Sequence, residues 1–191
     1  NGRENFTVNS PSPQDRLSVI TYLAPNSPEN DRAIGYDMYS ESARRTAQQQ
    51  ARDTAETVMT APVNLVQDGG SADKKGILAY YPVYSTPDIP TTVEARRANL
   101  RGFVYAVVHP ADMVSKYIND HRDEYENIAV TVRDETDSAN PSLLYQNGTA
   151  TSSTGIVTSQ INVDNRTWGV AVNGGASYTS LASPIVLFVL G

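Results

Sequence analysis

Short apolar runs with the spacing of β-strands alternate along this chain with segments whose small or apolar residues recur at helical spacing. Turn-forming residues, such as those from Pro25 to Asp31, separate the two kinds of segment. In the first half of the chain we expect strands at residues 17–23, 63–66, 76–84 and 102–108, and helices at residues 41–57 and 93–99.

The first expected helix has a face of small residues. Ser40 is a suitable N-cap, and an acidic Glu41 in the first turn is favoured by the helix dipole. Alanine then recurs every four residues, at positions 43, 47, 51 and 55, so one face is small enough to lie close against a sheet. The larger polar residues are expected mostly to face water or to cap a groove: Arg44, Arg45, Gln48, Gln49 and Arg52.

The second half predicts one helix followed by strands. Pro110 suits a first helical position, and apolar residues follow it at helical spacing. Strands are expected at residues 128–132, 143–145, 155–163 and 167–172, as an antiparallel meander. The fold class is therefore α/β (α+β), with two PAS-like modules built on antiparallel sheets. We place the first module at residues 1–109 and the second at residues 110–183.

The chain is acidic, with a formal net charge of -6 over 191 residues, and its longest basic clusters are Arg44–Arg45 and Arg96–Arg97. Because nucleic-acid affinity depends on neutralising phosphates, no nucleic-acid partner is expected. The absence of cysteine removes disulfides, thiolate nucleophiles and cysteine metal sites together. The two histidines, His109 and His121, are too far apart for a helical metal-binding pair. We therefore expect no metal and no cofactor.

The sequence ends on an apolar run at residues 184–191. A membrane-spanning helix needs about 20 apolar residues, so this run is too short to span. From the residues alone, two interpretations are equally open. The run is either a terminal core strand, which suits its Ile, Val and Phe residues, or the first turns of a transmembrane segment.

Motifs for catalysis are missing from the sequence. It contains no nucleophile elbow, phosphate loop, dinucleotide fingerprint or zinc-binding helix motif. With two histidines and no cysteine, nucleophilic catalysis is disfavoured, because the common nucleophiles need a nearby base. Hydrolysis by a carboxylate pair stays formally open, since the distance within such a pair cannot be derived from a sequence.

Asp37 differs from the other acids because its neighbours, including Tyr36, Met38 and Tyr39, are large and apolar or aromatic. A partly desolvated carboxylate needs hydrogen bonds or a positive partner. One interpretation is that Asp37 accepts hydrogen bonds from an amine or ring N–H of a ligand. The other is structural: it caps the following helix, or pairs with one of the two adjacent arginines.

Several motifs occur in one order between Gly35 and Tyr84. They are Gly-Tyr-Asp-Met-Tyr-Ser at residues 35–40, a helix with two adjacent arginines, Met-Thr-Ala-Pro at 59–62, and Gly-Ile-Leu-Ala-Tyr-Tyr-Pro-Val-Tyr at 76–84. In order and spacing they resemble the CHASE family, the extracytoplasmic sensory domains of histidine kinases and cyclic-nucleotide cyclases. The resemblance is strong over residues 22–84, fair to residue 113 and thin beyond.

The resemblance implies a receptor rather than an enzyme. It implies a periplasmic or extracellular sensor of a histidine kinase, in a two-component system, or of a diguanylate cyclase. Flanking transmembrane helices would join it to the membrane, and the full-length receptor would be a homodimer. The resemblance also favours the start of a transmembrane segment for residues 184–191. The long helix with which such domains usually begin is not expected here, so the chain resembles an excised piece.

The resemblance also implies a ligand site. In the plant members, which bind adenine-type cytokinins, an aspartate contacts the adenine, and Asp37 matches its position. The remaining implied ligand-binding residues are Tyr39, Met59, Thr60, Ala79, Tyr80, Tyr81 and Tyr105. The implied ligand is a small molecule, with adenine-like compounds among the candidates.

Two departures from the plant pattern imply altered specificity. A threonine that reaches the hormone's tail falls near Gln67–Asp68, and a glycine-rich strand meets Phe103–Tyr105, whose bulk would narrow the cavity. We expect a retained pocket with changed specificity. The alternatives are an ectodomain for partner binding or structural dimerisation without a small-molecule ligand and, more remotely, a carboxylate-dependent hydrolase.

Overall fold

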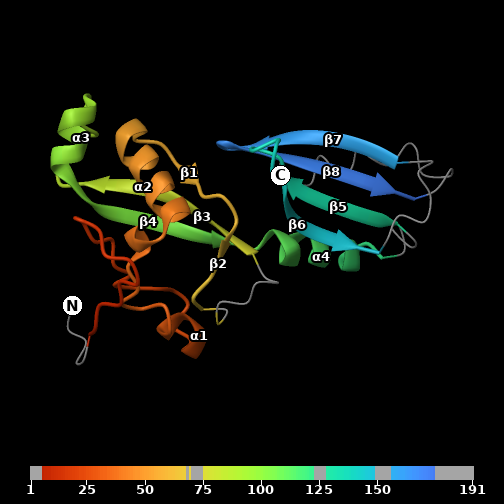
Figure 1. The fold of residues 1–191 in the computed structure, drawn as a ribbon, viewed down its shortest axis with the longest axis horizontal. Coiled ribbons are helices and arrows are strands. Elements are labelled where there is room, and N and C mark those ends of the chain that lie inside the picture. The colour runs from red at the N-terminus through yellow and green to blue at the C-terminus, as the bar shows by residue number, and fades with distance from the viewer. Residues whose placement is uncertain (1–5, 68, 70–74, 123–127, 149–155, 175–191) are drawn as a thin grey trace. The chain divides into compact units, whose positions relative to one another are not determined.

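The computed structural model describes residues 6–67, 69, 75–122, 128–148 and 156–174. The chain divides into two compact units, residues 1–108 and 109–191, each of which combines helices with antiparallel strands (Figure 1). The mixed α/β class is confirmed, whereas the PAS-like character of the modules stays a prediction. The terminal run at residues 184–191 lies outside the described residues.

The sheet of unit 1 is built on β3 (Lys75–Tyr84), which matches the strand expected at residues 76–84. It pairs antiparallel with β4 (Leu100–Val108) from Ile77 to Tyr84, and with the two-residue strands β1 (Val58–Met59) and β2 (Val63–Asn64). Successive side chains of a strand point to opposite faces. Tyr80 is therefore buried on one face, whereas Tyr81 is exposed on the other.

Helix α2 (Ser42–Thr54) packs on this sheet within unit 1 (Figure 1). The expected small face is confirmed, because Ala47 and Ala51 are both buried in the core. The expected ends are wrong by one and three residues. Glu41 is the N-cap and accepts hydrogen bonds from the N–H groups of residues 43 and 44. At the other end, Ala55 adopts a left-handed conformation, with φ of 63°, which stops the helix.

Besides α2, the described residues of unit 1 form three short helices: α1 (Pro28–Asp31), the 3₁₀ helix η1 (Met38–Ser40) and α3 (Val93–Asn99). Helix α3 has the bounds expected from the sequence. Ser40 ends η1 instead of capping α2, because its hydroxyl donates a 2.6 Å hydrogen bond back to the carbonyl oxygen of Asp37.

The strand expected at residues 17–23 is wrong. Val19, in this segment, forms an isolated antiparallel bridge with Asp37. Asn9, outside the segment, forms an isolated parallel bridge with Tyr36. Residues 35–38 thus bond to two different parts of the chain at once. They then turn into η1 at Met38, so neither pairing can extend into a ladder.

The described part of unit 2 contains α4 (Pro110–Asp120) and four strands, β5 (Ala129–Asp134), β6 (Ser142–Asn147), β7 (Ile156–Val163) and β8 (Arg166–Asn173). All pairings are antiparallel, but the spatial order β6-β5-β8-β7 is not the expected meander. Strands β5 and β8 carry the buried valines 130, 132, 170 and 172 and Trp168, so they occupy the centre. Among the described helices of both units, none is long and apolar enough to cross a membrane.

Candidate functional site

Asp37 is a fully buried carboxylate that organises the chain before α2. Its Oδ1 accepts hydrogen bonds from the backbone N–H groups of Ser18, at 2.8 Å, and Tyr39, at 3.0 Å. Its Oδ2 accepts a 2.7 Å hydrogen bond from the Ser10 hydroxyl. Asp37 thereby joins three segments of unit 1 and caps η1, whereas the helix it was expected to cap, α2, has Glu41 as its N-cap.

A cavity of about 540 Å³ lies beside this junction, within unit 1. This volume is within the usual range for small-molecule sites, about 300–1,000 Å³. Its walls come from the segment before α1, from η1, from one side of α2, and from β3 and β4. The lining residues are Arg16, Leu17, Ser18, Val19, Ile20, Thr21, Tyr22, Met38, Tyr39, Gln48, Gln49, Arg52, Tyr80, Leu100, Arg101, Gly102, Phe103 and Tyr105.

Three aromatic rings form the sheet side of the cavity. Tyr80 packs edge-on against Phe103, with ring centroids 5.8 Å apart, and lies 5.7 Å from the ring of Tyr105. Tyr80 and Tyr105 are direct partners in the β3–β4 register, which places both side chains on the same face. Ring faces and edges of this kind suit an apolar or aromatic ligand.

Polar groups without partners lie at the buried end of the cavity. The side chain of Gln48 is 1% exposed, and within the part of the chain that the structure describes neither its nitrogen nor its oxygen has a hydrogen-bond partner. The Tyr80 hydroxyl is likewise buried and has no partner with good hydrogen-bond geometry, although a weak side-chain hydrogen bond with Gln48 lowers its pKa. Buried polar groups are nearly always hydrogen-bonded in native proteins. Both therefore have free capacity for a ligand or a water molecule.

Burial also determines the protonation state of the cavity tyrosines. It raises the pKa of Tyr80 well above the ordinary value and that of Tyr105 to about 12. Hydrogen bonding with Gln48 lowers the pKa of Tyr80, and the charge of Arg44 lowers the pKa of both tyrosines. Both hydroxyls therefore remain protonated at neutral pH and can donate as well as accept hydrogen bonds.

The polar side of α2 differs from the expectation. Arg44 and Gln48 are buried, although they were expected mostly to face water or to cap a groove. The Arg44 guanidinium donates a 2.7 Å hydrogen bond to the carbonyl of Asn64 and lies over the ring of Tyr36. Further along the helix, Gln48, Gln49 and Arg52 line the cavity, so part of the expected groove-capping role is observed.

The structure brings three of the eight implied ligand residues together at the cavity: Tyr39, Tyr80 and Tyr105. The other five, Asp37, Met59, Thr60, Ala79 and Tyr81, are not among its lining residues.

The positions of these five residues follow largely from the pairing of β1 with β3 and the alternation of side chains along β3. Met59 pairs with Ala79 across β1 and β3, and Tyr81 is exposed on the outer face. Thr60 is buried and accepts a hydrogen bond from the N–H of Leu78. A ligand contact for these five residues remains a prediction.

Gln48, Gln49 and Arg52 were not recognised as candidate ligand contacts from the sequence, and Phe103 was expected only to narrow the cavity. Gln48 and Arg52 are four residues apart and therefore share a helix face. They directly follow Ala47 and Ala51, which places them at the border of the small face. That border position is the one signal that could have identified them.

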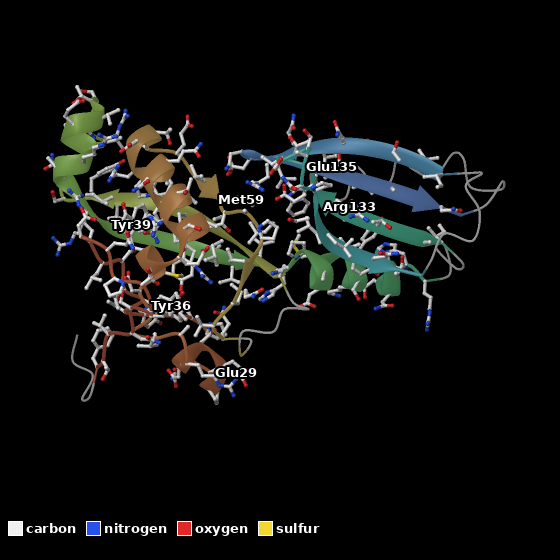
Figure 2. The ribbon with its side chains drawn as sticks, in the orientation of Figure 1. Glu29, Tyr36, Tyr39, Met59, Arg133 and Glu135 are labelled. Atoms are coloured by element: carbon white, nitrogen blue, oxygen red, sulfur yellow. The ribbon has the colours of Figure 1, made fainter. Side chains whose placement is uncertain are left out.

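Unit 2 has a shallower hollow, of about 470 Å³, on one face of its sheet. Arg133 and Glu135, both labelled in Figure 2, line it together with Gly169 and Gln160. Two of its polar groups already pair with each other, since Gln160 donates a 2.7 Å hydrogen bond to Glu135, whose carboxylate lies over Gly169. The unit 1 cavity is therefore the better candidate site. Among the described residues there is no group of three potential metal ligands.

A family model for the CHASE domain matches residues 1–145. The chain therefore belongs to the CHASE family, whose members are sensory, extracytoplasmic domains of membrane receptors and are not catalytic. The match covers the whole of unit 1, including the cavity, and continues into β6 of unit 2. A search of curated proteins finds no significant match to the chain.

Proposed function

We propose that this chain is the ligand-binding part of a membrane receptor, a histidine kinase or a diguanylate cyclase, and that a small molecule binds in the unit 1 cavity. Unit 1 would be the membrane-distal module and unit 2 the membrane-proximal one. Ligand binding would shift a two-state equilibrium of the ectodomain, which flanking helices transmit across the membrane of a dimeric receptor. The periplasmic or extracellular location follows from the same proposal.

One observation carries the proposal. The cavity combines three packed aromatic rings with an unpartnered amide on Gln48 and an unpartnered hydroxyl on Tyr80. A purely structural core would leave these groups without good hydrogen bonds, at a cost of about 1–3 kcal/mol for each buried group without a partner. A ligand that hydrogen-bonds both while packing on the rings would remove that cost.

Asp37 supports the site in this proposal. Its hydrogen bonds fix the backbone of Ser18 and Tyr39, and both residues line the cavity. Among the described residues, the hydrogen-bond partners of its carboxylate are the Ser10 hydroxyl and the backbone N–H groups of Ser18 and Tyr39, none of them a second acid. Its family-implied contact with a ligand remains part of the prediction, alongside this positioning role.

A thermal-shift screen of the full chain against a metabolite library tests the proposal. A ligand at 100 times its dissociation constant should stabilise the protein by about 2.7 kcal/mol. The same hits are then measured on Gln48→Met and Tyr80→Phe, each compared with its own ligand-free baseline. Gln50→Met is the matched control, because Gln50 is exposed on the same helix.

The proposal predicts hits whose stabilising effect falls in Gln48→Met and Tyr80→Phe and is retained in Gln50→Met. Hits that stabilise all four proteins equally would place binding elsewhere. A comprehensive library without any hit would favour the second candidate function.

That second candidate is self-association through the outer face of the β3–β4 sheet. Tyr81, Val83 and Val104 form an apolar strip there, and Val104 is 63% exposed. A receptor ectodomain that dimerises without a small molecule would need such a surface. Sedimentation velocity of the full chain and of Val104→Glu tests this: a dimer that the substitution dissociates supports it, and a monomer at all concentrations rejects it.

A further inference from the structure

The charge of the cavity wall indicates which ligands it suits. Three arginines line the cavity, Arg16, Arg52 and Arg101, and none of its described lining residues is acidic. This local excess of positive charge contrasts with the net charge of -6 for the whole chain. A cleft lined by charges of one sign raises the local concentration of ligands of the opposite sign.

Arg52 is the most firmly positioned of the three. Its side chain is 11% exposed, and its Nε donates a 2.6 Å hydrogen bond to Oδ1 of Asp53. Among the described residues, neither terminal nitrogen of its guanidinium has a side-chain or backbone acceptor. The group is therefore held in place while its outer donors remain available.

The charge of Arg52 is only partly compensated. Asp53 also receives two hydrogen bonds from Arg97, Nε to Oδ1 at 3.0 Å and Nη2 to Oδ2 at 2.6 Å. Two guanidinium groups thus share one carboxylate, which leaves one positive charge in the cluster. The fork-to-fork geometry of Arg97 makes it the stronger partner of Asp53. Arg52 is the member that is also open to the cavity.

We infer that the ligand of the unit 1 cavity is a small organic anion with a ring, whose anionic group pairs with Arg52 while the ring packs on Tyr80, Phe103 and Tyr105. This inference rests on the proposed function and specifies its ligand class. Gln48 and the Tyr80 hydroxyl hydrogen-bond polar atoms of the same molecule. A cationic ligand of the same shape is disfavoured, because three arginines and no acidic residue are among the described lining residues.

The test compares three probes with one ring and three charges: phenylacetate, phenylacetamide and phenethylammonium. Each is titrated into the ¹⁵N-labelled full chain at millimolar concentrations, and the Gln48 side-chain amide signal, identified by its loss in Gln48→Met, reports occupancy. Arg52→Gln removes the charge and keeps hydrogen-bonding capacity, while Arg97 remains to pair with Asp53. Arg32→Gln, the same change at an exposed position outside the cavity, is the control.

The expected result is tightest binding of phenylacetate, with affinity reduced at least tenfold in Arg52→Gln and unchanged in Arg32→Gln. Phenylacetamide, which carries no charge, should bind Arg52→Gln and Arg32→Gln with equal affinity. If the amide or the ammonium probe binds at the Gln48 signal as tightly as phenylacetate, the anion inference is overturned while the proposed function stands. If no probe moves that signal and the metabolite screen also gives no cavity hit, the proposed function fails together with the inference.

Discussion

Replacing Gln48 by Met should make the ligand-free protein more stable, which is the opposite of the usual result for a core substitution. The Gln48 amide is 1% exposed, with both polar atoms unpartnered among the described residues. Methionine has a similar length and shape and carries no buried N–H or C=O. The substitution therefore removes a desolvated group without opening a large cavity.

The magnitude follows from the desolvation cost. A buried polar group without a partner costs about 1–3 kcal/mol. We count the amide as one such group, although both its N–H donors and its oxygen lack a good hydrogen bond. We expect Gln48→Met to raise the free energy of unfolding of unit 1 by about 1–3 kcal/mol. For a unit of this size the melting temperature should rise by about 4 °C or more for each kcal/mol.

Native-state hydrogen exchange is the suitable assay, because the one tryptophan of the chain lies in unit 2. Protection of the amides of α2 and β3 gives the free energy of opening for unit 1. The control Gln50→Met should change it by less than about 0.5 kcal/mol, as expected for an exposed position. A loss of 1 kcal/mol or more in Gln48→Met would show that the Gln48 amide is satisfied in the ligand-free protein, and the reasoning would be refuted.

Three further predictions concern stability. Asp53→Asn should cost about 1 kcal/mol at pH 7. Hydrogen bonds from two arginines hold the pKa of Asp53 far below its ordinary value. Its stabilisation is therefore present above the unfolded-state pKa of about 4 and lost at lower pH. If Asp53→Asn lowered the free energy of unfolding by the same amount at pH 7 and at pH 3, this prediction would be contradicted. Asp134→Asn should cost about 3 kcal/mol, because it removes the buried carboxylate that the partly buried Arg166 contacts at 2.7 Å and leaves that arginine without a charged partner. Denaturation followed by Trp168 fluorescence measures it, and a loss under about 1 kcal/mol would argue against a buried ion pair. Gly35→Ala should cost more than about 1 kcal/mol, since φ is +88° and a Cβ would meet a backbone carbonyl oxygen. Unchanged exchange protection of the segment around residue 35 would oppose that prediction.

Local sequence signals predicted the elements that depend on them. Helix α3 begins after Thr92, whose hydroxyl accepts a hydrogen bond from the N–H of Ala95, and it ends where a strand begins at Leu100. Both ends are therefore determined by residues that are close in the sequence. Strand β3 was recognisable because its apolar run is long and its neighbours are polar. The small face of α2 was equally visible in the four-residue repeat of alanine.

Elements that depend on distant pairing could not be predicted. The order β6-β5-β8-β7 is determined by which strands carry the most buried residues, and that becomes apparent only when the sheet is assembled. The segment at residues 17–23 has the composition of a strand. It does not form one because its partner, residues 35–38, is also bonded to Asn9 and turns into η1.

The candidate site was predicted in part for a related reason. Neighbouring residues of a strand point to opposite faces, so only one of Tyr80 and Tyr81 can face the cavity. The sequence does not tell which one, because that choice depends on the side of the sheet on which α2 packs. Likewise, Gln48 lies at the border of the apolar face. The segment at residues 16–22, distant from it in the sequence, lines the same cavity.

The most direct test of the account is a crystal structure of the full chain with the strongest stabilising compound from the metabolite screen. The compound is expected to lie in the unit 1 cavity against Tyr80 and Tyr105, with its polar atoms bonded to the Gln48 amide and an anionic group at Arg52. A compound bound in the hollow of unit 2, or on the surface with the Gln48 amide still unpartnered, would contradict it.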